Sequence, residues 1–192
     1  VANSTHAKGF MVTEWGDNGH IQQFPIQLPP SVFGLCGAWN KDSLESLSLS
    51  ATLANIFYLT PSLVSDGRTY SYSTYALLSK SLCDLEKIGE LYNKHLHNTT
   101  LLGALLTYHL YPYYREDVKK AKGYTFLKER IAINEIENLL LSALSNVEAY
   151  MKDEILFTLE LLQFLSDYGL ALLSTTDVEI EQISLNERGD LI

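Results

Sequence analysis

The residue with the clearest potential for covalent chemistry is Cys36, in the stretch Phe33-Gly-Leu-Cys36-Gly-Ala-Trp39. This stretch comes just before a segment with helical periodicity, and the dipole at a helix N-terminus stabilises a thiolate nucleophile. A histidine within hydrogen-bond reach would act as its base, and His20 and His109 are the candidates. The pattern allows a cysteine-dependent hydrolase or transferase. The sequence favours the alternative, in which Cys36 packs as a small apolar side chain between a connector and a helix.

The Cys36-Gly-Ala sequence resembles the surroundings of the nucleophile in papain-like cysteine proteases. The resemblance covers a handful of residues and implies a histidine base carried on a strand after the nucleophile. This sequence lacks the second cysteine of that pattern, and Trp39 comes one position too early. Downstream of Cys36, His95, His97 and His109 fall on segments with helical periodicity. The sequence therefore does not assign the chain to this family.

Histidines and carboxylates are the usual ligands of metal ions, but their spacing here does not build a site. His95 and His97 are two residues apart, which on a helix places them on different faces. Glu179 and Glu181 alternate along a predicted strand, and Glu14 lies near a predicted turn. Clustered acids serve metal binding or acid–base chemistry, but they are also the usual covering of an exposed sheet edge. We therefore predict no metal site and, without a phosphate-binding glycine loop, no cofactor.

Aromatic residues provide the better candidates for a binding surface. Four tyrosines crowd around Pro112, and a tyrosine combines a large contact area with a polar tip that suits interfaces. The alternative is an ordinary aromatic rim to the core. The residues predicted to bind a partner are Tyr108, Tyr111, Tyr113, Tyr114, Trp15 and Trp39.

The charge balance excludes one large class of partner. The net charge is −9 and the pI about 4.9, so the average field repels a phosphate backbone. We therefore predict no nucleic-acid binding. Cys36 and Cys83 are the only cysteines, and two reduced buried thiols are favoured over one disulfide. This slightly favours a cytoplasmic protein, while the absence of an initiator methionine at Val1 leaves secretion open.

Local patterns at the two ends predict β-structure. Residues 9–24 form two segments rich in β-formers around Gly16-Asp-Asn-Gly19, which is typical of a tight turn. Pro25, Pro29 and Pro30 are expected to end the second strand and to make an extended connector. Near the C-terminus, Val178 to Leu185 alternates in polarity like a strand. We expect this strand to pair with the N-terminal hairpin, because a lone hairpin is marginal in water.

Between the two ends, apolar residues recur at helical spacing. The spacing, capping residues and prolines place five helices at about 42–60, 73–97, 99–111, 125–151 and 154–173, with a short amphipathic turn at 115–122 and a break at Gly89. The last helix is apolar around most of its circumference. Such a helix is either buried in the centre of a bundle or covered by a partner.

The predicted fold is mainly α in the α+β class, a bundle of about five helices with a small antiparallel sheet from the N-terminal hairpin and the C-terminal strand. We predict one domain over 1–192, made of a hairpin and connector (1–30), a helical bundle (42–174) and a strand and turn (177–192). The uncharged stretches 46–65 and 98–114 carry polar residues or prolines, so no membrane span is predicted.

The sequence supports two functional hypotheses. The favoured one is a non-catalytic helical module for protein–protein interaction or assembly, with a protein partner or a homo-oligomer covering its apolar surfaces. The alternative is the cysteine-dependent enzyme that uses Cys36.

Overall fold

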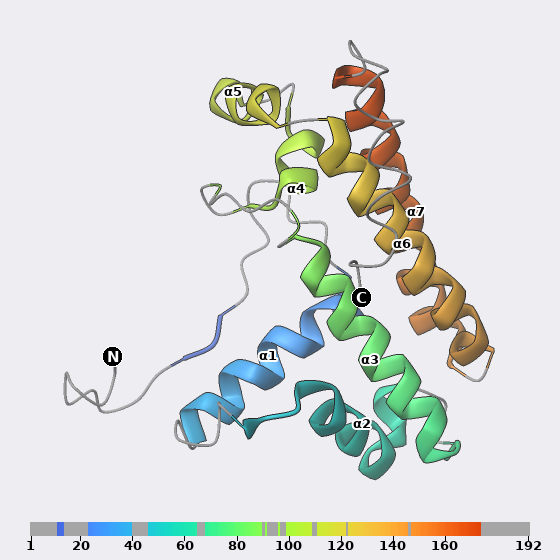
Figure 1. Ribbon diagram of the computed structural model, residues 1–192. Coiled ribbons are helices and arrows are strands. Elements are labelled where there is room, and N and C mark those ends of the chain that lie inside the picture. The colour runs from blue at the N-terminus through green and yellow to red at the C-terminus, as the bar shows by residue number, and fades with distance from the viewer. Residues whose placement is uncertain are drawn as a thin grey trace, which may run out of the picture.

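The computed structural model describes residues 11–13, 23–39, 46–64, 68–89, 91, 96, 99–108, 111–121, 123–145 and 147–173. Within these ranges the protein is a bundle of seven α-helices and a short 3-10 helix, η2 (Figure 1). The helices are α1 (Phe24–Trp39), α2 (Leu49–Leu59), η2 (Pro61–Leu63), α3 (Tyr72–Ile88), α4 (Leu101–Leu106), α5 (Pro112–Lys120), α6 (Gly123–Leu144) and α7 (Ala149–Leu173).

The predicted antiparallel sheet is wrong for the part of the chain that the structure describes. No strand occurs there, and the β-type pairing is an isolated bridge between Leu96 and Thr99. Phe24, expected to end a strand, begins α1 instead. Most of the predicted hairpin (residues 14–22) and the whole predicted C-terminal strand lie outside the described residues, so their pairing is not tested.

The predicted extended connector is also wrong, because residues 25–30 belong to α1. Pro25 occupies the first turn of that helix, where a backbone N–H has no intrahelical partner in any case. Pro29 and Pro30 each remove one backbone hydrogen bond. Ile26, Leu28, Pro29 and Val32 recur at helical spacing, and the three aliphatic side chains pack partly buried against the core. This packing offsets the lost hydrogen bonds and makes the segment helical.

Several other boundaries follow local signals that the sequence carries. The break predicted at Gly89 is confirmed, since α3 ends there. The helix predicted over 99–111 is shorter than expected, because α4 ends at Leu106 and not at Pro112. Pro112 instead begins α5. The single helix predicted over 125–151 is two helices: α6 ends at Leu144 and α7 begins at Ala149.

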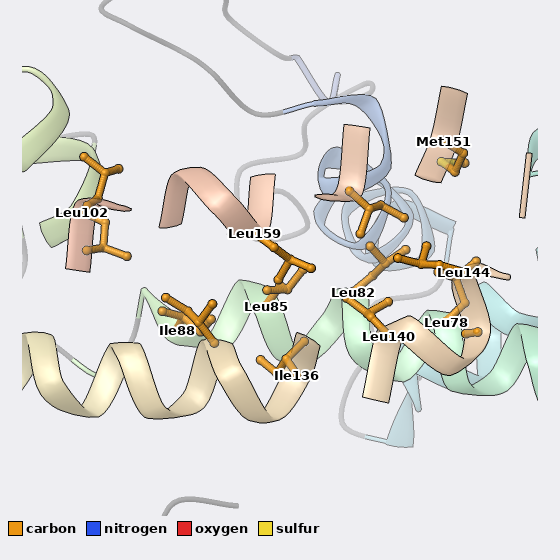
Figure 2. Packing of buried hydrophobic residues seen from close by; sticks show 14 of the residues in the cluster. Leu78, Leu82, Leu85, Ile88, Leu102, Ile136, Leu140, Leu144, Met151 and Leu159 are labelled. Carbon is orange, nitrogen blue, oxygen red and sulfur yellow. The ribbon is translucent and has the colours of Figure 1, made fainter. Parts of the chain in front are cut away.

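The core forms where α3 packs against α6. Figure 2 shows Leu78, Leu82, Leu85 and Ile88 of α3 among Ile136, Leu140 and Leu144 of α6, with Met151 and Leu159 of α7 close by. All of these side chains are 7 % exposed or less. Burying an aliphatic side chain of this size contributes about 1.5–3 kcal/mol. Helix α2 covers the other side of α3, and α1 contacts α2, α3 and α7.

Helices α6 and α7 lie antiparallel, and polar contacts fix their register. The Arg130 Nε donates to Asp167 Oδ1 over 3.0 Å, and the Gln163 amide donates to Glu137 Oε2 over 2.6 Å. At its start α7 is tied to η2, because the Tyr150 hydroxyl donates to the Leu63 carbonyl over 3.3 Å. The side of α7 that carries Met151, Ile155, Leu159 and Leu165 is buried in the bundle, and these polar contacts lie along its border with the exposed side.

The short helix α4 depends on its N-cap. The Thr100 Oγ1 accepts a hydrogen bond from the Gly103 N–H over 3.1 Å. We expect Thr100→Ala to lower the free energy of unfolding by about 1 kcal/mol, because it leaves an N–H at the helix start without a partner. Chemical denaturation measures the change. Thr100→Ser keeps the oxygen and should retain most of the stability; if alanine is tolerated as well as serine, the cap does not stabilise α4.

Candidate functional site

Cys36 does not occupy the position that the enzyme hypothesis requires. It lies in the last turn of α1, half-buried and with a free thiol, and not ahead of a helix N-terminus. The negative end of the helix dipole is near this turn and disfavours a thiolate. His20 and His109 lie outside the described residues. The catalytic role of Cys36 stays a prediction, and it has lost the local feature on which it was based.

The predicted tyrosine surface divides into a buried and an exposed part. Tyr114 is 5 % exposed, and burial together with a hydrogen bond that its hydroxyl donates to Tyr113 raises its pKa above the ordinary value. Tyr111 and Tyr108 pack partly buried against the core, and the Arg115 guanidinium lies 6.0 Å from the Tyr108 ring centre. Tyr113 remains half-exposed, with its ring centre 4.2 Å from that of Tyr114. These rings mainly join α4 to α5, and Tyr113 is the one that offers contact area outward.

The structure describes the side chain of neither tryptophan of the predicted surface. Trp39 is the last residue of α1, and its side chain lies outside the described part of the structure. Trp15 also falls outside the described residues, as do the acids Glu14, Glu179 and Glu181. Within the described ranges, no group of three or more histidine, cysteine, aspartate or glutamate side chains could hold a metal ion.

Glu129 on α6 is a buried acid that sequence analysis did not single out. Its side chain is fully buried, on the stripe of α6 that also carries Phe126 and Ile133, and neither carboxyl oxygen has a hydrogen-bond partner. Burial raises its pKa from the ordinary 4.5 to about 8. Glu129 is therefore mostly protonated at neutral pH, and its position inside the bundle gives it no access to a substrate. Glu129 lies between Lys128 and Arg130 in the sequence, so it reads as part of a charged, exposed stretch. Only the rotation of α6 about its axis, which the structure shows, identifies this acid as buried.

The structure shows a regular row of exposed side chains on α7 that the sequence analysis did not predict. From Tyr150 to Asp167, the exposed positions of this helix are 150, 153, 157, 160, 164 and 167, and none of the positions between them is exposed. They alternate between aromatic and acidic residues: Tyr150, Asp153, Phe157, Glu160, Phe164 and Asp167. We call these six residues the α7 seam. The spacing of three and four was present in the sequence, but a helix so rich in apolar residues hides which of its faces points outward.

Other large apolar side chains are exposed elsewhere but are less regular. Leu59 at the end of α2 is 79 % exposed, and the half-exposed rings of Tyr58 and Tyr72 contact each other. Phe33 and Leu35 on α1 are also exposed. Single exposed apolar residues are common on protein surfaces and need no special explanation.

Helix α7 also has the length and composition of a membrane-crossing helix, and it is the one described helix that does. A core helix passes the same test. Here Met151, Ile155, Leu159 and Leu165 are 2 % exposed or less and pack inside the bundle. One face of the helix is thus already occupied by protein.

Comparison with protein-family models, with curated proteins and with solved structures finds no match to this chain.

Proposed function

We propose that this protein is a non-catalytic helical module for protein–protein interaction or assembly, and that the α7 seam is its binding surface. The observation that carries the proposal is the outward row of Tyr150, Phe157 and Phe164, which are 47 %, 49 % and 63 % exposed. Each ring leaves a large apolar area in water. Aromatic residues are enriched at interfaces, and a partner that covers these rings gains the corresponding burial energy.

The described residues also support a binding role over a catalytic one. The half-buried thiol of Cys36 sits at the unfavourable end of a helix, and the buried acid Glu129 has no route to a substrate. Catalysis requires a reactive group beside a place where substrate can sit. The exposed groups of α7 instead lie along a continuous helix backed by a packed core, which is a rigid platform for a partner.

Photochemical crosslinking tests this proposal in the cells that make the protein. A photoreactive phenylalanine analogue placed at position 164 should give a discrete adduct with a protein partner or with a second copy, because that side chain lies in the interface. The same analogue at Glu116, an exposed position on α5, is the matched control and should give none. An analogue at Tyr113 asks separately whether the tyrosine surface contributes.

The outcomes separate clearly on a denaturing gel. An adduct from position 164 and not from position 116 supports the proposal. Light scattering on the purified protein then distinguishes a homo-oligomer from the 21.6 kDa monomer awaiting a different partner. If neither position 164 nor position 157 gives an adduct above the control at Glu116, the α7 seam is not a binding surface and the proposed function is wrong.

A further inference from the structure

The α7 seam has the spacing of a coiled-coil interface. Its residues follow one another at intervals of three and four, so aromatic residues repeat every seven positions and acids repeat every seven positions between them. A seven-residue repeat of this kind keeps one line of side chains facing a partner helix. At a rise of about 1.5 Å per residue, the line from Tyr150 to Asp167 extends over about 25 Å. A single helix of about 20 residues could therefore contact all of it.

The rings of the seam are partly fixed before any partner binds. The Phe164 ring stacks on Tyr168 of the following turn, with centres 6.2 Å apart and planes 6° from parallel. The Tyr150 hydroxyl is held by the Leu63 carbonyl. Side chains that are already ordered lose less conformational entropy on binding, which favours tight association.

The acids of the seam define what can cover it. Among the described residues, no hydrogen bond or ion pair engages the carboxylates of Asp153 and Glu160. Asp167, the last residue of the seam, forms an ion pair with Arg130 of α6. A partner that buries the rings must also bury or approach these carboxylates. Burying an unpaired charge is costly, so a compatible partner has to bring cations to the same positions.

We propose, on the basis of the proposed function, that the α7 seam binds a basic amphipathic helix of another protein. The partner helix carries apolar side chains opposite Tyr150, Phe157 and Phe164. It carries arginine or lysine opposite Asp153 and Glu160. Charge complementarity sets the register and the rate of association, and the rings provide most of the affinity.

A second copy of the same helix does not meet this requirement. Pairing two α7 seams in parallel sets acids against acids, and pairing them antiparallel sets acids against aromatic rings. Either arrangement buries carboxylates without a cation. The net charge of −9 adds long-range repulsion between copies.

A lipid surface does not meet the requirement for cations opposite the seam carboxylates either. The seam carries three carboxylates and no basic residue, so an anionic leaflet repels it, as it repels the acidic protein as a whole. Insertion would place carboxylates in hydrocarbon, at a cost of about 2.5–3.5 kcal/mol each near the bilayer centre.

A designed peptide tests the inference with the full-length protein. The probe is a fluorescently labelled helix of about 20 residues in which leucine and arginine alternate at spacings of three and four, with alanine and glutamine elsewhere. We expect fluorescence anisotropy to give a Kd on the order of 1–100 µM. Phe157→Ser and Phe164→Ser should each weaken binding about tenfold. Leu59→Ser changes an exposed apolar residue outside the seam and should have no effect.

A charge exchange gives the sharpest discrimination. Glu160→Lys should weaken binding of the arginine peptide about tenfold, and a peptide in which glutamate replaces only the arginine opposite position 160 should recover binding to that variant. If a peptide with glutamine at the arginine positions binds the seam equally well, the basic partner is wrong while the interaction function stands. If neither position 164 nor position 157 gives a crosslinked adduct, the interaction function itself is wrong.

Three further results would overturn the inference. The first is a peptide affinity that the seam variants leave unchanged. The second is a dimer by light scattering that Phe164→Ser dissociates, which would make a second copy the occupant. The third is sedimentation of the protein with phosphatidylcholine vesicles that depends on Phe164, which would make a membrane the occupant.

Discussion

The wild-type protein should lose stability steadily as the pH rises from about 5 to 8, and the Glu129→Gln variant should not. The buried carboxyl of Glu129 has a pKa of about 8 in the folded protein, against an ordinary value of 4.5. The folded state therefore holds a proton that the unfolded chain releases. The stabilisation from that proton is complete below pH 4.5 and is lost as the pH rises through 8.

The expected effect is large because it accumulates over several pH units. Each unit between the two pKa values changes the free energy of unfolding by roughly 1 kcal/mol. At pH 8 we expect Glu129→Gln to be more stable than the wild type by about 2–4 kcal/mol, since the amide never ionises. Chemical denaturation at pH 5, 6, 7 and 8 measures the two slopes.

The control for this comparison is Glu160→Gln, which removes an exposed carboxylate from α7. It should shift the stability by less than about 0.5 kcal/mol at every pH. Parallel pH curves for the wild type and Glu129→Gln would show that Glu129 ionises in the folded state as readily as in the unfolded chain.

Gly169→Ala should destabilise the protein, although alanine normally stabilises a helix relative to glycine. A Cβ atom at position 169 of α7 would lie 2.5–2.7 Å from three ring carbons of Phe126, which is fully buried on α6. The usual helix preference would gain about 1 kcal/mol. Overpacking of a rigid ring outweighs it, and we expect a net loss of about 1–3 kcal/mol.

A double-mutant cycle identifies the cause of that loss. Phe126→Leu removes the edge of the ring, so Gly169→Ala should cost less in that background, with a coupling energy of about 1 kcal/mol or more. Gly103→Ala is a matched control within α4, because its new Cβ would meet the Thr99 hydroxyl on a side chain that can rotate away. If Gly169→Ala is as stable as the wild type, α6 and α7 do not approach as closely as the structure places them.

Helix termini were the part of the fold that local sequence signals predicted best. Gly89 and Thr100 mark ends in the sequence and in the structure because a cap depends on a few adjacent residues. The opposite holds for Pro29 and Pro30. Their local preference is against a helix, and it is overridden by packing of Ile26 and Val32 on a core formed by distant helices. The sequence pattern of this segment alone could not predict that packing, because the core is built by residues far away in the chain.

The candidate binding surface was predictable only in part. The sequence indicated that the last helix has more apolar surface than a single buried face can use, and that a partner could cover the rest. It could not show that Phe157 and Phe164 point outward while Leu159 and Leu165 point inward, because all four fit an apolar helix. Which side chains of α7 face outward depends on how this helix is rotated about its axis relative to α6. The contacts of Arg130 and Glu137 with α7 fix that rotation.

Chemical-shift mapping of the isotope-labelled protein tests the central claim most directly. On addition of the leucine–arginine peptide, the largest amide shifts should follow the exposed line of α7, from Tyr150 through Phe157 and Phe164 to Asp167. The amide signals around Leu59 should not shift. Shifts concentrated at the end of α2 or on α5, or no shifts at saturating peptide, would show that the α7 seam is not the surface through which this protein binds a basic helix.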